Sequence, residues 1–286
     1  MYTVHRIIMI LKKIVDILIW KLCYPNKIKI DFLVFITGQK CTLRCRHCGN
    51  FTPLLPQTFY SFNEISSDLE KMLEVSKIYR LQIQGGEALI YPELVDLLWR
   101  LKTKKVCSIH IATNGTRELT DEQIRAIRKV GATIRISDYQ VNNKISAITD
   151  KLVKQCKKNR IRYRLYRFVS GDSSWIDMGG KDIEREDDDA KVKRTFDSCP
   201  FNICLTLEDG LIARCSRATV SHLVQDFTPA ENDLIESRTM SAKELGKRLK
   251  EYMKNPTFME ACRYCYGSSG GSIKAAEQYQ YAPRKK

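Results

Sequence analysis

The sequence lacks any uninterrupted apolar stretch of about 20 residues, which is the length that a membrane-spanning helix needs. Its most apolar run, residues 7–22, contains Lys12, Lys13 and Asp16, and no small-residue cleavage site of a secretory signal follows it. Two hypotheses remain for this N-terminal amphipathic helical segment, which we place at residues 1–29. It packs on the body of the protein, the interpretation we favour, or it makes peripheral contact with a membrane interface. We expect a cytoplasmic protein.

Acidic residues are too few to balance the basic ones: 33 Asp and Glu stand against 48 Lys and Arg, a formal net charge of +15. Such an excess suggests an anionic partner, which could be a phosphorylated substrate, a nucleic acid or a membrane surface. A dense run that interleaves basic residues with aromatics is missing apart from residues 160–168, whose sequence RIRYRLYRF is more typical of a strand. For the many Lys and Arg on helix-like stretches a solvated face is the favoured interpretation. An anionic partner stays the alternative, and the pattern argues against nucleic acid.

Disulfides are not expected either, because a reducing cytoplasm keeps thiols free. The chain nevertheless has 11 cysteines, an odd number, and most of them fall in two groups. Clustered cysteines in such a compartment point to metal ligation or redox chemistry. The three isolated cysteines, Cys23, Cys107 and Cys156, are predicted to be small buried apolar residues.

Strand-like and helix-like patterns alternate from the β-rich stretch 27–38 onward. Because a parallel crossover needs about a dozen residues, this alternation predicts βαβ units and a parallel sheet. About five or six such units are too few for a closed eight-stranded barrel. We predict an α/β fold, a partial (β/α)6-type TIM barrel, with helices at 62–78, 92–104, 120–130 and 143–158 and further strands at 80–84, 106–114, 132–137 and 161–169.

Composition changes after the predicted barrel. A turn-rich stretch is followed by a charged one without apolar periodicity, which predicts a linker or exposed loop. Two β-prone runs around Asp209-Gly210 then predict a hairpin, and a helical stretch near 241–254 follows it. We predict a barrel at residues 30–170 and a linker at 171–198. A small hairpin-plus-helix unit should follow at 199–270, and a frayed tail at 271–286.

The first cysteine group, Cys41, Cys45 and Cys48, follows directly on the strand predicted at 27–38. It therefore lies at the carboxyl edge of the sheet, where α/β proteins place their chemistry. Three thiolates can hold three irons of a cubane cluster and leave the fourth iron open to a ligand, as catalytic zinc keeps an open position. Zinc is the alternative, but the spacing on one short loop does not supply a tetrahedral set. We predict an iron–sulfur cluster at these three cysteines.

This C-x3-C-x2-C motif after a strand resembles the signature of the radical S-adenosylmethionine (SAM) superfamily. The resemblance implies that the three cysteines are catalytic and bind a [4Fe–4S] cluster to which SAM attaches. Gly85-Gly86-Glu87 matches the family's GGE motif, which contacts the methionyl amino group of SAM. Taken alone, each supporting motif has an ordinary alternative, a tight turn or a cap. The resemblance also implies cofactor binding near the ribose by Thr113 and Asn114, near the SAM carboxylate by Ser137 and near the adenine by His47.

The second group contains five cysteines and resembles the auxiliary-cluster domain of the SPASM and shorter twitch type, in which a hairpin and a following helix bind one [4Fe–4S] cluster. Cys199 fits the spacing of that family and Cys204 does not, so Cys204 is the less favoured ligand. A four-cysteine zinc site stays the alternative, because the two kinds of site share ligands. The resemblance implies an auxiliary cluster held by Cys199, Cys215, Cys262 and Cys265.

The resemblance covers roughly residues 30–270 and implies an oxidoreductase or related radical-transfer enzyme. Such an enzyme cleaves SAM reductively to a 5′-deoxyadenosyl radical, which abstracts hydrogen from the substrate. A one-electron donor of the flavodoxin or ferredoxin type is an implied partner. Only about 30 residues precede the first strand, too few for a peptide-recognition domain. We therefore favour oxidation or rearrangement of a small molecule, such as a sugar or a nucleotide-linked compound, over modification of a peptide or protein.

Two functions of other classes stay open. A zinc-binding protein that binds nucleic acid would use the charge and the cysteine groups. An electron-transfer iron–sulfur protein would need neither the GGE motif nor a SAM-sized site. Candidate substrate contacts lie near predicted strand ends or in the loop after them, although a structural role is as good an interpretation for each: Asp138, Tyr139, Trp175 and Asp177.

Overall fold

One eight-stranded sheet forms the centre of the computed structural model, which describes residues 26–102, 106–168, 175–254 and 256–279. The strands lie in the order β5-β4-β3-β2-β1-β7-β8-β9, so the strand that comes first in the sequence is central. β1 pairs in parallel with β2 and with β7, and β3, β4 and β5 continue the parallel sheet. The bounds of these strands are Ile28–Ile36 (β1), Ser76–Gln84 (β2), Ser108–Thr113 (β3), Thr133–Asp138 (β4), Arg162–Arg167 (β5) and Leu205–Glu208 (β7).

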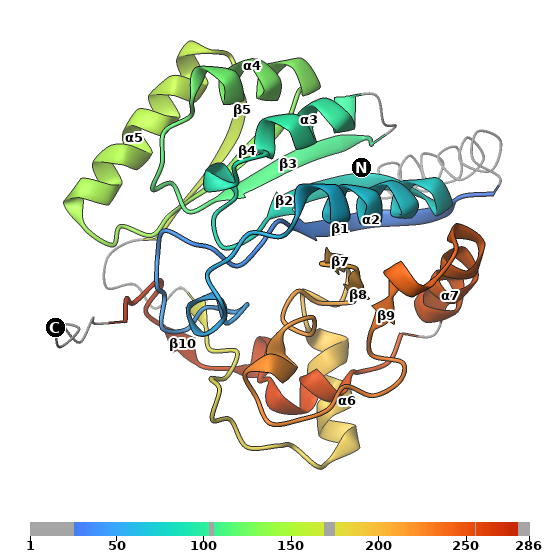
Figure 1. Cartoon of the computed structure of the whole chain (residues 1–286). Helices are drawn as coiled ribbons and strands as arrows, with labels where there is room; N and C mark the ends of the chain where they lie inside the picture. Colours follow the sequence, from blue (N-terminus) through green and yellow to red (C-terminus); the bar gives the residue numbers. More distant parts are fainter. Residues whose placement is uncertain (1–25, 103–105, 169–174, 255, 280–286) are drawn as a thin grey trace, which may run out of the picture.

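Helices connect the parallel strands and cover one face of the sheet (Figure 1). Their apolar sides and the facing strand residues form one core, in which Leu81, Ile83 and Leu94 are fully buried. This mixed α/β architecture with a mostly parallel sheet confirms the predicted partial barrel. The helices occupy the predicted places, at Phe62–Val75 (α2), Leu94–Lys102 (α3), Asp121–Val130 (α4) and Asn143–Lys158 (α5). The bounds of α5 are those predicted, whereas residues 76–78, predicted as helix, belong to β2.

Local capping fixes where the connecting helices begin and end. The hydroxyl of Thr120 accepts a hydrogen bond from the backbone N–H of Gln123 at 3.2 Å, and the Gln123 side chain accepts one from the Thr120 backbone at 3.1 Å. This capping box satisfies two amides that a helix start leaves unpaired. Gly131 ends α4 with φ of 67°, a conformation that glycine adopts without steric cost. Because α4 ends at Val130, the chain can turn at Gly131 and begin β4 at Thr133.

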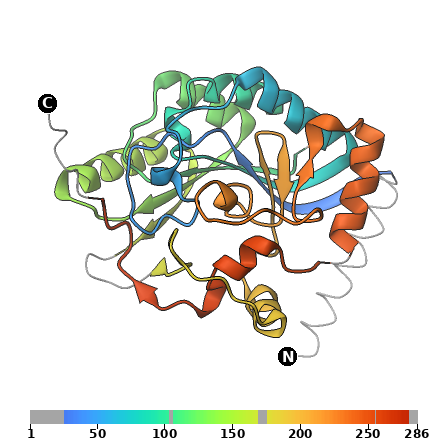
Figure 2. The same cartoon turned by 60° about the horizontal axis from the view of Figure 1, so that its bottom comes forward.

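The predicted hairpin is confirmed and extends the barrel sheet. β8 (Leu211–Ala213) returns antiparallel to β7, and β9 (Ile235–Glu236) pairs with β8. Asp209 and Gly210 have φ of 47° and 85°, and positive values at both turn positions are what a type I′ turn requires. Leu205, Leu207 and Ile212 are buried in the same core as the barrel strands. The hairpin therefore packs as part of the barrel sheet, beside β1 (Figure 2).

Residues 189–198, which the sequence pattern placed in a linker, instead form helix α6 (Asp189–Ser198). The carboxylate of Asp188 caps it by accepting hydrogen bonds from the Ala190 and Lys191 amides at 2.9 and 3.3 Å. Only Val192 and Phe196, one turn apart, are buried, so the helix carries too little apolar periodicity to stand out from charged neighbours. The helical stretch near 241–254 is present as α7 (Ala242–Lys254).

The described part of the predicted frayed tail returns to the first cysteine loop. β10 (Ser272–Ile273) pairs antiparallel with β6 (Trp175–Ile176). Beyond it, the Arg46 amide donates to the Glu277 carbonyl at 2.6 Å, and the Tyr279 amide donates to the Arg44 carbonyl at 2.9 Å. Figure 1 shows this red segment beside the blue loop that follows β1. These contacts are made by backbone groups, which leave no residue pattern, so the composition of the tail could not predict them.

The predictions for the N-terminal segment and for the isolated cysteines have different outcomes. Residues 7–22 and Cys23 lie outside the described residues. None of the helices in the described ranges combines the length and the apolar character that crossing a bilayer requires. Cys156 is buried in the core as predicted, but Cys107 is exposed, because it precedes β3 at the surface end of the strand.

Candidate functional site

The loop after β1 brings the first three cysteines to one cavity of about 480 Å³ at the carboxyl ends of the parallel strands. Cys41, Cys45 and Cys48 all line it, and Leu43 and Ala276 pack beside them. This places the predicted ligand set on one wall of one cavity, where open parallel sheets bind ligands.

Amide groups point at the sulfur atoms of this loop. The Leu43 backbone N–H and the Asn114 side-chain amide donate to Cys41 Sγ at 3.4 and 3.6 Å, and the Gln278 side-chain amide donates to Cys45 Sγ at 3.4 Å. Such donors stabilise a thiolate.

Burial has the opposite effect on these thiols. It raises the pKa of Cys41 to about 11 and that of Cys45 to about 12, so both thiols keep their protons at neutral pH until a metal displaces them. Within the described ranges, no three cysteine, histidine or carboxylate side chains converge as the ligands of one ion do. In a cubane each thiolate binds a different iron, so convergence on one point is not required of such a site.

The two glycines after β2 let the neighbouring loop approach. A Cβ on Gly86 would lie 2.3 Å from the carbonyl oxygen of Lys40, and one on Gly85 would lie 2.8 Å from that of Gly38. The Gly86 amide donates to the Gly38 carbonyl at 2.9 Å. Both glycines line the cavity, and their lack of side chains holds the start of the cysteine loop against β2.

The carboxylate of Glu87 is turned into the protein. It is 2% exposed, does not line the cavity, and accepts hydrogen bonds from the Leu89 and Asn114 amides at 2.9 and 2.8 Å. Burial raises its pKa, against the lowering effect of these bonds. The structure thus gives Glu87 a role that the sequence motif does not reveal, that of joining the ends of β2 and β3.

The remaining predicted cofactor residues, Thr113, Asn114, Ser137 and His47, all line the cavity. Asn114 is tied to the cysteine loop, because its amide donates to the Thr42 hydroxyl at 3.0 Å. Nε2 of His47 lies 3.9 Å from a carboxylate oxygen of Glu277 in the returning tail.

The predicted substrate contacts divide into two pairs. Tyr139 and Trp175 line the cavity and meet edge to face with ring centroids 5.2 Å apart. Asp138 is buried and paired with Arg167 at 2.9 Å, and Asp177 accepts from the Gly179 amide at 2.9 Å. The two aromatic residues therefore face the cavity, whereas the two carboxylates hold local structure.

Sequence reasoning missed three cavity residues on the inner face of the sheet: Gln82, Arg135 and Tyr166. Arg135 donates a short hydrogen bond to the Gln82 side chain, and its guanidinium lies 5.3 Å from the centroid of the Tyr166 ring. Alternating polar residues in these strands were the available signal, but alternation alone also fits a solvent-facing surface.

Four cysteines of the second group line a separate cavity of about 40 Å³. They are Cys199, which caps α6, Cys215 after β8, and Cys262 and Cys265 in and after the short 3-10 helix Glu260–Tyr264. Cys204 does not line this cavity. It is buried against Val34 and Ile36, and its thiol donates to the Phe201 carbonyl at 3.1 Å. The structure thus groups the four cysteines that the spacing favours.

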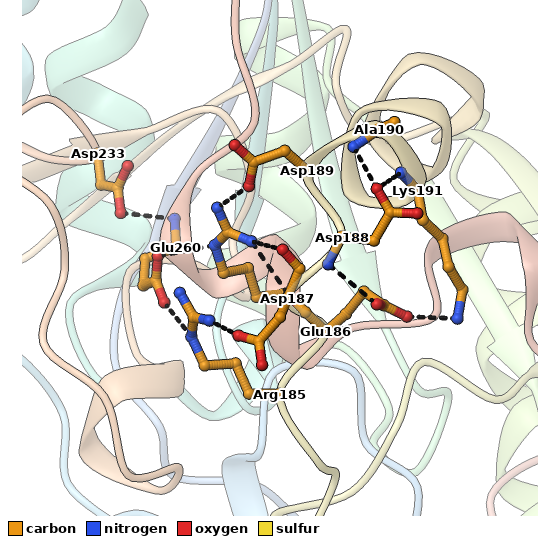
Figure 3. A network of polar contacts seen from close by, with 10 residues as sticks. Arg185, Glu186, Asp187, Asp188, Asp189, Ala190, Lys191, Asp233 and Glu260 are labelled. Atoms are coloured by element: carbon orange, nitrogen blue, oxygen red, sulfur yellow. Dashed lines mark hydrogen bonds and ion pairs between the residues drawn. The ribbon is translucent and has the colours of Figure 1, made fainter.

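A polar network joins the segments that carry these cysteines (Figure 3). Arg185 donates to the Glu260 carboxylate at 3.0 Å, and the Glu260 amide donates to Asp233 at 2.8 Å. Arg263 pairs closely with Asp189 at the start of α6. The network therefore fixes the helix before Cys199 relative to the 3-10 helix of Cys262, although its exposed ion pairs each contribute little energy.

Comparison with known proteins gives the class of this site. The family model of the radical SAM superfamily matches residues 35–163, which hold the three-cysteine loop and the strand ends around it. Residues 35–163 therefore match a radical SAM domain, a match that indicates an enzyme of a family whose members use a [4Fe–4S] cluster and SAM.

Curated relatives are distant. GTP 3′,8-cyclase of Clostridium perfringens is 22% identical over 159 residues, 50% of this chain and 48% of that protein. GTP 3′,8-cyclase 1 of Mycobacterium tuberculosis is 31% identical over 101 residues, 32% of this chain and 27% of that protein. The chain thus matches about half or less of the length of these relatives.

Among solved structures, BtrN in complex with AdoMet and 2-DOIA superimposes with a TM-score of 0.52 at 13% identity. The superposition covers 89% of this chain and 99% of BtrN. At this identity the likeness shows a shared fold, which includes the region after the barrel.

Proposed function

We propose that this protein is a radical SAM enzyme that removes hydrogen from an anionic small molecule in order to oxidise or rearrange it. The observation that carries the proposal is the convergence of Cys41, Cys45 and Cys48 on one cavity beside Gly85 and Gly86, within the matched domain. When bound, a reduced [4Fe–4S] cluster supplies the electron that cleaves SAM to methionine and a 5′-deoxyadenosyl radical.

The chain's own residues would bind, orient and shield these groups. The three thiolates would hold three irons, and the amides of Leu43, Asn114 and Gln278 would stabilise the charge of Cys41 and Cys45. Gly85 and Gly86 would form part of the cavity wall to which SAM binds, beside Ser137 and Asn114. The aromatic rings of Tyr139 and Trp175 would shield their side of the cavity from water, which protects a radical from side reactions.

We further propose that the second cysteine group holds an auxiliary [4Fe–4S] cluster of the SPASM or twitch type. Four cysteines line one cavity there, which supports four protein ligands. A cubane with four thiolates has no open iron, so its role would be to take an electron from the substrate radical and not to bind the substrate. The small unit of residues 199–270 would then serve as the electron exit of the enzyme.

The inner face of the sheet supports an anionic substrate. Arg135 and Arg164 are register partners on β4 and β5, so their side chains leave the same face of strands about 4.8 Å apart. No carboxylate among the described residues pairs with either guanidinium. Two like charges side by side cost stability, and an anion bound between them would remove that cost. Ser137 and Tyr166, the next pair on this face, line the cavity.

The pKa of His110 is affected by the positive potential of this face. Burial, followed by the charges of Arg80, Arg135, Arg164 and Arg162, lowers the pKa of His110 to about 4. His110 is therefore neutral at physiological pH and adds no charge of its own. Several guanidiniums acting together match a phosphoryl or diphosphoryl group better than a single carboxylate.

The substrate proposal is tested with inorganic pyrophosphate as the probe, by calorimetric titration of the holoprotein. We expect Arg135→Ala to weaken binding by about tenfold or more, because a charge-assisted bidentate contact is lost. The affinity of Arg135→Lys for pyrophosphate should lie between those of the wild type and Arg135→Ala, since lysine keeps the charge but cannot make a bidentate contact. Arg125→Ala removes the same charge from the exposed face of α4 and should bind as the wild type does. Equal affinity in Arg135→Ala and Arg125→Ala would contradict the proposal.

The proposed activity is tested on protein reconstituted with iron and sulfide under strict exclusion of oxygen. Added SAM should change the electron paramagnetic resonance spectrum of the reduced first cluster, and 5′-deoxyadenosine should accumulate. Metal analysis of anaerobically purified protein decides against the zinc alternative if iron is found. An unchanged spectrum and no 5′-deoxyadenosine would refute the proposed activity whatever the pyrophosphate titration shows.

A further inference from the structure

A buried arginine lies between the two cysteine sites. Arg217 is 3% exposed, and its side chain donates to the carbonyl oxygens of Gly49 at 3.3 Å, Gly179 at 2.7 Å and Tyr264 at 3.4 Å. Gly49 directly follows Cys48 of the first site. The guanidinium therefore touches the loop of the first cysteine group and the segment that carries the second.

The same residue is tied to the second site at its backbone. The Arg217 amide donates to Cys215 Sγ at 3.4 Å, and the side chain lines the cavity of the four cysteines. Tyr264, whose carbonyl it binds, directly precedes Cys265. Met178 lines both cavities, so the two sites share a wall.

The charge of Arg217 has no carboxylate partner. Among the described residues it forms no ion pair, and its buried Nε has no hydrogen-bond partner. Its guanidinium carbon lies 4.0 Å from the centroid of the Phe51 ring, an apolar neighbour that cannot neutralise it fully. A buried cation held by neutral carbonyls alone is costly and needs a nearby negative charge.

Cysteine sulfurs on both sides, bound in clusters, and the nearby carboxylate of Asp177 are the groups that can supply this charge. The Arg217 amide contacts Cys215 Sγ, and its guanidinium binds the carbonyls of the residues next to Cys48 and Cys265. Thiolate clusters are anions, and each gains a further negative charge when it is reduced, so a fixed cation nearby favours the reduced form.

We propose that Arg217 is the shared counter-cation of the two clusters and raises the reduction potential of both. It acts through the clusters and is a positioning residue, not a catalytic one. The role rests on the proposed function, because it requires clusters at both cysteine groups. It also explains why an unpaired guanidinium is kept in the wall between them, where a neutral side chain would pack at lower cost.

The test is a redox titration of both clusters, followed by electron paramagnetic resonance, in the reconstituted protein. In Arg217→Met, the ratio of reduced to oxidised cluster at a fixed potential should fall by about tenfold at both sites, a shift of about 59 mV for one electron. Arg217→Lys keeps the charge and should restore most of the shift. Arg125→Met, on the exposed face of α4, controls for net charge and should leave both potentials unchanged.

Several outcomes decide the matter. If Arg217→Met assembles no clusters, the potentials of Arg217→Lys decide: values near those of the wild type at both sites support the proposal, and values lowered by about 59 mV or more overturn it. Wild-type potentials in Arg217→Met, or equal shifts in the Met and Lys variants, overturn it. Failure of both variants to assemble clusters also overturns it, because lysine supplies the cation. Normal clusters with unchanged potentials reject the role of Arg217 alone, whereas wild-type protein without iron rejects the proposed function as well.

Discussion

Replacing Cys45 with alanine should abolish SAM cleavage. Cys45 is 8% exposed, lies on the cavity wall and receives a hydrogen bond from Gln278 at its sulfur. Without its thiolate one iron loses its protein ligand, so the cluster cannot be held with a single open position. We expect 5′-deoxyadenosine, measured by chromatography after anaerobic reduction, to fall by at least about three orders of magnitude.

A second buried cysteine provides the matched control for this variant. Cys156 on α5 is fully buried in the hydrophobic core and lines neither cavity, so Cys156→Ala should keep cleavage while losing about 1 kcal/mol of unfolding free energy. The comparison separates loss of a ligand from loss of packing. Undiminished 5′-deoxyadenosine from Cys45→Ala would end the case for a cluster on this loop.

Replacing Cys262 with alanine should uncouple the reaction. The iron content should fall by about four atoms per chain, because one ligand of the auxiliary cluster is lost. Cleavage of SAM in the absence of substrate should persist, since Cys262 does not line the first cavity. Formation of the product from the substrate should stop, because the electron of the substrate radical has no acceptor. Iron analysis and product assays measure the two effects separately.

Cys204→Ala is the matched control for Cys262→Ala. Cys204 is buried, 7% exposed, and lies outside the cavity of the other four cysteines. We expect this variant to keep its full iron content. The opposite pattern, in which iron is retained in Cys262→Ala and lost in Cys204→Ala, would mean that the ligands of the second site have been misassigned.

Much of the barrel could be predicted because its signals are local. The period of apolar residues and the caps, such as the capping box at Thr120 and Gln123, determine α4 without help from the rest of the chain. The turn at Asp209-Gly210 was predictable for the same reason, since both residues tolerate positive φ. The spacing of the cysteines likewise allowed both groups of candidate ligands to be predicted.

The parts that escaped prediction depend on contacts between distant segments. Nothing local distinguishes Arg135, which lines the cavity, from an arginine on a solvated strand, because only the curvature of the sheet decides which face is enclosed. The carboxylate of Glu87 is turned away from the cavity by amides at the start of a 3-10 helix and at the end of another strand. Helix α6 was missed because two buried residues in ten give too weak a period.

The return of residues 276–279 to the cysteine loop has a consequence for biosynthesis. Gln278 lies 233 residues after Cys45 in the sequence, and its side chain bonds to Arg44 and Cys45. Until this segment has been synthesised, Cys45 lacks the amide that contacts its sulfur. Iron delivered during translation would therefore meet the cysteine loop before the segment covers it.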